Sequence, residues 1–183
     1  MTIPDEERAT LLALAREAVA ARVSGRALPK PETLEGTLGQ VRGCFVTLTN
    51  QGRLRGCIGT FHPSKPLGEM IVEMGAAAAA DPRFVRDPIT AEEVEQLDVQ
   101  VSVLSPLVET KEPESLEIGT HGIYVTNGYR SGCFLPEVAP DQGWNAAEFL
   151  SYCCAHKAGL PADAWRMLDT KVLLFTSEKF SDT

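Results

Sequence analysis

Residues 54–61, with the sequence LRGCIGTF, place an arginine and a cysteine two positions apart. Because successive side chains of a strand point to opposite faces, Arg55 and Cys57 are expected to share one face of a strand. A neighbouring cation lowers the pKa of a thiol, and the thiolate is the nucleophilic form of cysteine. The pair therefore indicates a site that uses a thiol or binds an anion.

Two glycines, Gly56 and Gly59, interrupt the same stretch. Glycine weakens a strand and usually marks a bulge, a bend, or a place where a ligand or a second backbone comes close. We expect the backbone here to leave room for a substrate, with Arg55, Gly56, Gly59 and Thr60 among the binding residues. A small cysteine between glycines also fits a tight gap in a core, so a structural role for Cys57 stays open.

A thiol nucleophile needs a base, and two residues elsewhere in the chain are candidates. His121 stands at the entrance of an expected strand, and Glu137 directly follows the proline that breaks another expected strand. We therefore expect Cys57, His121 and Glu137 to be the catalytic residues, brought together by folding. Arg83, in the DPRF segment 81–84, lies at a helix end where its charge can reach a cleft, and it is added to the substrate-binding residues. A helix stop with a surface ion pair is the alternative interpretation of that segment.

Several other classes of site are disfavoured by the sequence. The three histidines and five cysteines show no zinc-like spacing, so no metal site is expected. Nucleotide-binding and hydrolase signatures such as GxxxxGK[ST], GxGxxG, GxSxG and HExxH are absent. The net charge of −8 opposes binding to phosphate backbones, which makes nucleic acid a disfavoured partner.

The composition is that of a globular protein inside the cell. The chain has 183 residues, 44% of them hydrophobic, and no apolar run approaches the ~20 residues needed to span a bilayer. Residues 1–25 lack the features of a secretory signal, so we expect a cytoplasmic protein with reduced cysteines and no membrane association. The length favours a single domain over two ordinary ones.

The elements that must position these residues can be read from the hydrophobic pattern. Apolar residues at helical spacing predict helices, and alternating apolar residues predict strands. The expected helices are 4–23, 64–80, a short one after Thr90, 143–158 and 162–167; the expected strands are 41–49, 53–61, 98–104, 123–126, 133–138 and 170–177. Hairpins with interspersed helices and no regular β-α-β alternation favour an α+β fold with a mixed or antiparallel sheet and flanking helices.

Six short motifs distributed along the chain together resemble one known family. They are LRGCIGTF at 54–61, DPRF at 81–84, VSVL at 101–104, HGI at 121–123, LPEVA at 135–139 and KAGL at 157–160. The chain closely resembles the AMMECR-type family, whose prokaryotic members are called AmmeMemoRadiSam system protein A. The resemblance implies a single domain over residues 1–183, with a larger and a smaller lobe, a cleft between them, and LRGCIGTF near that cleft. The lobe boundary cannot be assigned from the sequence.

The resemblance also implies partners, although it supplies no established reaction and no cofactor. Relatives look like partners of a Memo-type protein, similar to extradiol dioxygenases, and of a radical S-adenosylmethionine (SAM) enzyme. This association implies an enzyme or enzyme subunit whose cleft, built on residues 54–61, binds a small or modified substrate. The alternative is a non-catalytic adaptor that binds a peptide or a protein surface.

Overall fold

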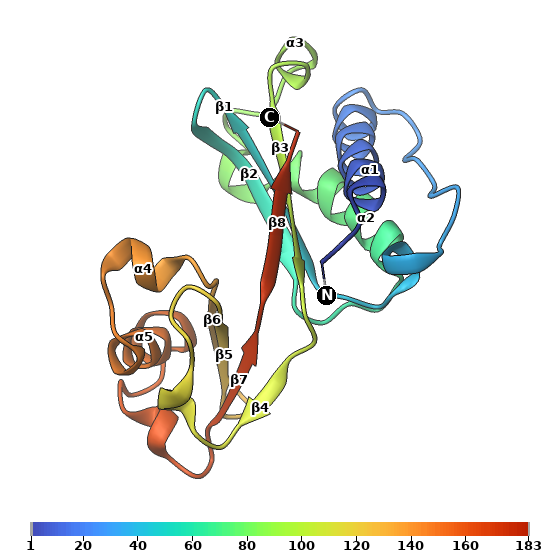
Figure 1. Cartoon of the computed structure of the whole chain (residues 1–183). Helices are drawn as coiled ribbons and strands as arrows, with labels where there is room; N and C mark the ends of the chain where they lie inside the picture. Colours follow the sequence, from blue (N-terminus) through green and yellow to red (C-terminus); the bar gives the residue numbers. More distant parts are fainter. Residues whose placement is uncertain (1, 183) are drawn as a thin grey trace. The chain divides into compact units, whose positions relative to one another are not determined.

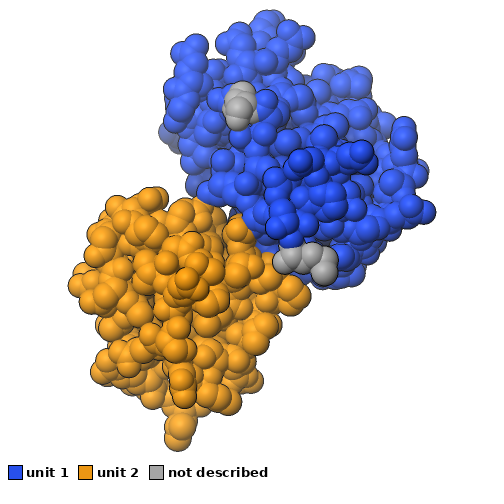
Figure 2. Space-filling view, in the orientation of Figure 1, with its two compact units in different colours: residues 1–104, 178–183 blue, residues 105–177 orange. Residues whose placement is uncertain are grey.

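The computed structural model describes residues 2–182 and divides the chain into two compact units. Unit 1 runs to Leu104 and resumes at Glu178, and unit 2 is formed by Ser105–Ser177 (Figure 2). Each unit has its own sheet and its own cluster of buried apolar side chains. The boundary that the sequence left unassigned therefore falls at two chain crossings, after residues 104 and 177.

Unit 1 is a four-stranded sheet with two helices packed on it (Figure 1). The strand order is β2-β1-β3-β8, and β1 pairs antiparallel with both β2 and β3. The strands are β1 (Cys44–Asn50), β2 (Arg53–Thr60), β3 (Asp98–Leu104) and β8 (Ser177–Ser181), and the helices are α1 (Asp5–Val23), α2 (Leu67–Ala78) and α3 (Ala91–Val94). β2 is thus an edge strand of this sheet.

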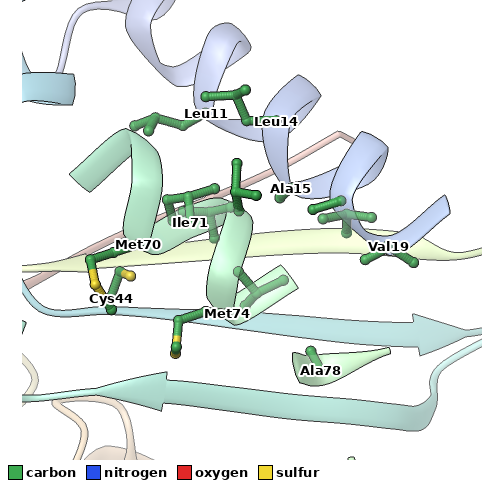
Figure 3. Close-up of a cluster of buried hydrophobic side chains, with 14 of the residues drawn as sticks. Leu11, Leu14, Ala15, Val19, Cys44, Met70, Ile71, Met74 and Ala78 are labelled. Carbon is green, nitrogen blue, oxygen red and sulfur yellow. The ribbon is translucent and has the colours of Figure 1, made fainter. Parts of the chain in front are cut away.

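The core of unit 1 follows from the periodicity of its elements. The alternate β1 residues Cys44, Val46 and Leu48 are fully buried and face α2, which packs on β1 and β2. α1 lays its apolar face against α2, with Leu11, Leu14, Ala15 and Val19 turned toward Ile71 and its neighbours (Figure 3). The helices thereby fix which side of the sheet is buried.

A tight hairpin connects β1 to β2. Asn50 pairs with Arg53, so the loop contains only Gln51 and Gly52, with φ of 51° and 78°. Positive φ at both loop positions is typical of the type I′ turn, whose twist matches that of antiparallel strands. The expected strands at 41–49 and 53–61 are confirmed with small changes at their ends.

Unit 2 is a second four-stranded antiparallel sheet, in the order β4-β7-β5-β6. Its strands are β4 (Val108–Thr110), β5 (Gly122–Thr126), β6 (Ser131–Phe134) and β7 (Lys171–Phe175), and its helices are α4 (Val138–Gln142) and α5 (Ala146–Tyr152). Asn145 and Glu148 form a capping box at the start of α5. The expected helix 143–158 changes after Tyr152 to a π-helical turn, Cys153–Ala158, and ends at Gly159 with φ 65°.

Two strand predictions were only partly right. The strand expected at 133–138 stops at Phe134, and α4 begins at Val138, because Pro136 cannot donate to a strand ladder. The strand expected at 170–177 is β7, and the chain then enters β8, which belongs to the other sheet. The α+β class is confirmed, with two four-stranded sheets instead of one. Within residues 2–182, no helix has the length and apolar character needed to cross a bilayer.

Candidate functional site

A β-bulge in strand β2 decides where the arginine of LRGCIGTF points. The pairing of β1 with β2 shifts by one residue after Leu48, so that Arg55 is left without a partner on β1. Leu48 is buried against the helices and lies opposite Gly56, whereas Cys57 lies opposite Thr47 and faces away from the helices. Arg55 is only 3% exposed, and its partners show that it turns to the helix-covered side.

The partners of Arg55 are two carboxylates that follow the DPRF segment. Nε of Arg55 donates to Glu93 Oε1 at 2.6 Å and Nη2 donates to Glu93 Oε2 at 3.1 Å. Asp87 accepts from Nη1 at 3.2 Å with its carboxylate and from Nη2 at 3.0 Å with its carbonyl. The hydrogen bond with Glu93 is the main cause of a raised pKa for Arg55 and of a lowered pKa for Glu93. The expectation that Arg55 shares a face with Cys57 and activates it is therefore wrong.

Other atoms of the protein occupy the space beside the two glycines of the motif. A Cβ on Gly56 would lie 2.1 Å from the carbonyl oxygen of Ala78 at the end of α2. A Cβ on Gly59 would lie 2.3 Å from the Phe45 ring and 2.3 Å from the Cys44 carbonyl oxygen. A second backbone or a ring comes close at both positions, so the room expected there for a substrate is taken by the protein itself.

The DPRF segment holds the backbone of Cys57 at the edge of the sheet. The Cys57 N–H donates to Asp81 Oδ2 at 3.0 Å, and the Cys57 carbonyl accepts from Arg83 Nη2 at 3.2 Å. Asp81 also accepts from the Arg83 backbone N–H at 3.0 Å and from its guanidinium at 2.6 Å. These bonds satisfy the outward polar groups of an edge strand, which otherwise invite pairing with another chain. The segment therefore ends a helix, as one interpretation of the sequence anticipated, and also binds the edge strand. We call the pair Asp81 and Arg83, which binds the Cys57 backbone, the clamp.

Arg83, not Arg55, is the cation that contacts Cys57, through the Cys57 carbonyl oxygen. Its side chain is 57% exposed, whereas the side chain of Asp81 is 1% exposed. The Arg83 guanidinium and the N–H donors hold the pKa of Asp81 well below its usual range. The pKa of Arg83 is raised, chiefly by the hydrogen bond to Asp81 and to a smaller degree by the charge of Cys57 as a thiolate. The Thr47 hydroxyl lies 3.2 Å from Cys57 Sγ and donates to it.

The other four cysteines have pKa values raised by burial. Cys44, Cys153 and Cys154 are buried, and burial raises the pKa of each, to about 12 for Cys44. Cys133 is half-buried like Cys57, but burial raises its pKa as well. A raised pKa keeps a thiol protonated and therefore poorly nucleophilic. Cys57 is the half-exposed cysteine that has a guanidinium next to it.

The other two predicted catalytic residues belong to unit 2. His121 Nδ1 accepts the backbone N–H of Glu117 at 2.9 Å, which places the proton of the neutral ring on Nε2. His121 lines a recess of about 690 Å³ beside β4 and the end of β7. Glu137 immediately precedes α4. Cys57, His121 and Glu137 thus do not meet within one compact unit, and their joint role stays a prediction.

Comparisons with known proteins agree with the motifs. A family model described as AMMECR1 matches residues 12–180, which is nearly the whole chain. The chain belongs to the AMMECR1 family. A protein of Methanothermobacter thermautotrophicus is 40% identical over 97% of this chain and 95% of its own, and one of Methanopyrus kandleri is 43% identical over 97% and 89%. The crystal structure of an uncharacterized protein from Pyrococcus horikoshii matches with a TM-score of 0.85 at 38% identity, covering 98% of this chain and 93% of that one.

In this AMMECR1-family chain, sequence reasoning missed the partners of both Arg55 and Cys57. Glu93 lies in the short helix that the sequence predicts after Thr90, but nothing in the sequence indicates that its carboxylate binds Arg55. Thr47 carries no signal by itself, because only strand pairing brings it opposite Cys57. The signal for the clamp was present in the chain, since Asp81 and Arg83 are opposite charges two residues apart at a helix end. Thr60, the remaining expected binding residue, accepts the backbone N–H of His62 at 3.0 Å through its hydroxyl.

Proposed function

We propose that this AMMECR1-family protein is an enzyme or enzyme subunit that binds a small or modified substrate beside the Cys57 thiol. The observation that carries the proposal is the pairing of a half-exposed thiol with the largely exposed guanidinium of Arg83, which is bound to the carbonyl of the same cysteine. Of the predicted binding residues, Arg83 rather than Arg55 would hold an anionic group of the substrate. Arg55 is already committed to Glu93 and Asp87.

The chemistry of the site follows from these contacts. Arg83 carries the positive charge that faces Cys57, and its raised pKa includes a contribution from the negative charge of a Cys57 thiolate. The Thr47 hydroxyl fixes the direction of the sulfur through its hydrogen bond. Cys57 then serves as a nucleophile or as a thiol contact for the substrate. His121 and Glu137 are retained as the proposed proton-transfer residues.

The proposed partners are a Memo-type protein and a radical SAM enzyme. Family membership supports this association, because it is what the resemblance to AmmeMemoRadiSam system protein A implies. The protein would then supply the binding site for a substrate that its partners modify.

One observation favours the adaptor alternative. Arg55, Gly56 and Gly59 all have partners inside unit 1, so most of the hallmark motif serves folding. In this case the face of β2 that carries Cys57 would receive a peptide or a protein surface, and no bond would change.

Alkylation of the native protein with iodoacetamide near neutral pH, mapped by mass spectrometry, tests the thiol proposal. Cys133 is the matched control, because it is also half-buried but has a raised pKa. We expect Cys57 to react first and Arg83→Gln to slow that reaction without changing the rate at Cys133. Reaction at Cys133 before Cys57, or no effect of Arg83→Gln, contradicts the enzyme proposal. Normal activity of the assembled system with Cys57→Ser would favour the adaptor instead.

A further inference from the structure

A recess of about 560 Å³ opens on the other side of the bulge, within unit 1. Its walls come from the last turn of α1, the end of α2 and the segment 82–89. The volume lies within the range of ~300–1,000 Å³ that is typical of small-molecule sites. This recess is lined by Arg55 but not by Cys57, so it is a different place from the proposed thiol site.

The walls of the recess are mainly apolar. Val23, Ala79, Phe84 and Ile89 line it, and the Phe84 ring lies 5.9 Å from the Arg55 guanidinium carbon. Such walls exclude water from a bound apolar group and strengthen any polar contact made at the same time. The occupant should therefore have an apolar body.

The lining side chains offer free donors but no free acceptor. Arg55 has five N–H groups, and four of them are used by Glu93 and Asp87, which leaves one on Nη1. Arg22 lines the recess from the last turn of α1, and its side chain forms no hydrogen bond or ion pair with any residue in 2–182. The lining carboxylate, Asp81, is already occupied by the Cys57 N–H and by Arg83.

This arrangement selects the polar group of the occupant. Guanidinium groups match carboxylates in charge and geometry, and a carboxylate has no donor that would need an acceptor. From these contacts we infer that the recess binds a small monocarboxylate with an aromatic or branched apolar body. Its carboxylate would be held between Arg22 and the remaining N–H of Arg55, and its body would pack against the four apolar residues.

The test is a titration of the full chain with 1-naphthaleneacetate, followed by amide chemical shifts in nuclear magnetic resonance. We expect saturable shifts at Val23, Ala79 and Ile89 with a Kd of about 1 mM or below. Arg22→Gln should weaken binding about tenfold, since it removes the only unpaired cation of the recess. Arg86→Gln is the matched control, because Arg86 is exposed and does not line the recess.

A neutral probe of the same shape, 1-naphthaleneacetamide, separates the role of the charge from that of the apolar body. It should bind about tenfold more weakly than the carboxylate to the native chain, and equally weakly to Arg22→Gln. Absence of saturable shifts at the lining amides overturns the inference. Equal affinity for the two probes, or equal effects of Arg22→Gln and Arg86→Gln, overturns it as well. None of these results depends on the reactivity of Cys57.

Discussion

Replacing the clamp carboxylate, Asp81→Asn, should destabilise the edge of unit 1 by about 2–4 kcal/mol. The side chain of Asp81 is 1% exposed and accepts from the Cys57 and Arg83 backbone N–H groups as well as from the Arg83 guanidinium. An amide turns one acceptor oxygen into a donor, so at least one of these N–H groups loses its partner. Bonds to a charged acceptor contribute about 1.5–3 kcal/mol each, and the exposure of Arg83 reduces the ion-pair share.

Hydrogen exchange at the Cys57 amide is the most direct assay. Both tryptophans, Trp144 and Trp165, lie in unit 2, so fluorescence would report the wrong part of the chain. A loss of 2–4 kcal/mol corresponds to exchange about 30- to 900-fold faster at neutral pH. Arg83→Gln, which keeps the buried carboxylate and removes a largely exposed cation, should have a smaller effect, of about 1 kcal/mol.

The same prediction has a pH dependence with a defined sign. The pKa of Asp81 is lower in the folded protein than in the unfolded chain, where it is about 3.9. A depressed pKa means that the carboxylate stabilises the fold above about pH 4 and that this contribution is lost as the pH falls further. The stability gap between the native chain and Asp81→Asn should therefore narrow in acid. A gap that is absent at pH 7, or that widens on acidification, refutes the reasoning.

Three further changes should give distinct results. Gly56→Ala should destabilise unit 1 by about 3 kcal/mol or more, because its Cβ would lie 2.1 Å from the Ala78 carbonyl oxygen. Denaturant titration followed by circular dichroism measures this loss. Gly68→Ala is the control and should be tolerated, because the atoms nearest to its Cβ are side-chain carbons at 3.3 Å. Glu93→Gln should cost about 3 kcal/mol at pH 7 in the same assay and less below about pH 4, because the pKa of this carboxyl is lowered in the fold. Asn145→Ala should cost about 1 kcal/mol, measured by tryptophan fluorescence, since it removes the capping box of α5. A tolerated Gly56→Ala, a pH-independent Glu93→Gln effect, or an unchanged midpoint for Asn145→Ala would count against the respective interpretation.

The sequence by itself determined the elements whose signals are local. The helix expected at 4–23 and the strands expected at 41–49, 53–61 and 98–104 all follow from patterns of residues within a few positions of one another. Such signals act through backbone preferences and side-chain spacing, which the chain carries before it folds. The six motifs likewise sufficed to indicate the family that the comparisons then showed.

Only the tertiary structure decided the arrangement of the charged residues. Strand alternation put Arg55 beside Cys57, but the bulge turned it to Glu93, 38 residues away, and left Arg83 as the cation that contacts Cys57. The division of the segment 171–181 into β7 and β8, which belong to different sheets, was likewise decided by the tertiary structure. The physical reason is that a buried guanidinium must find its carboxylates and an edge strand must satisfy its polar groups, and the residues that do so are neighbours only in the folded chain.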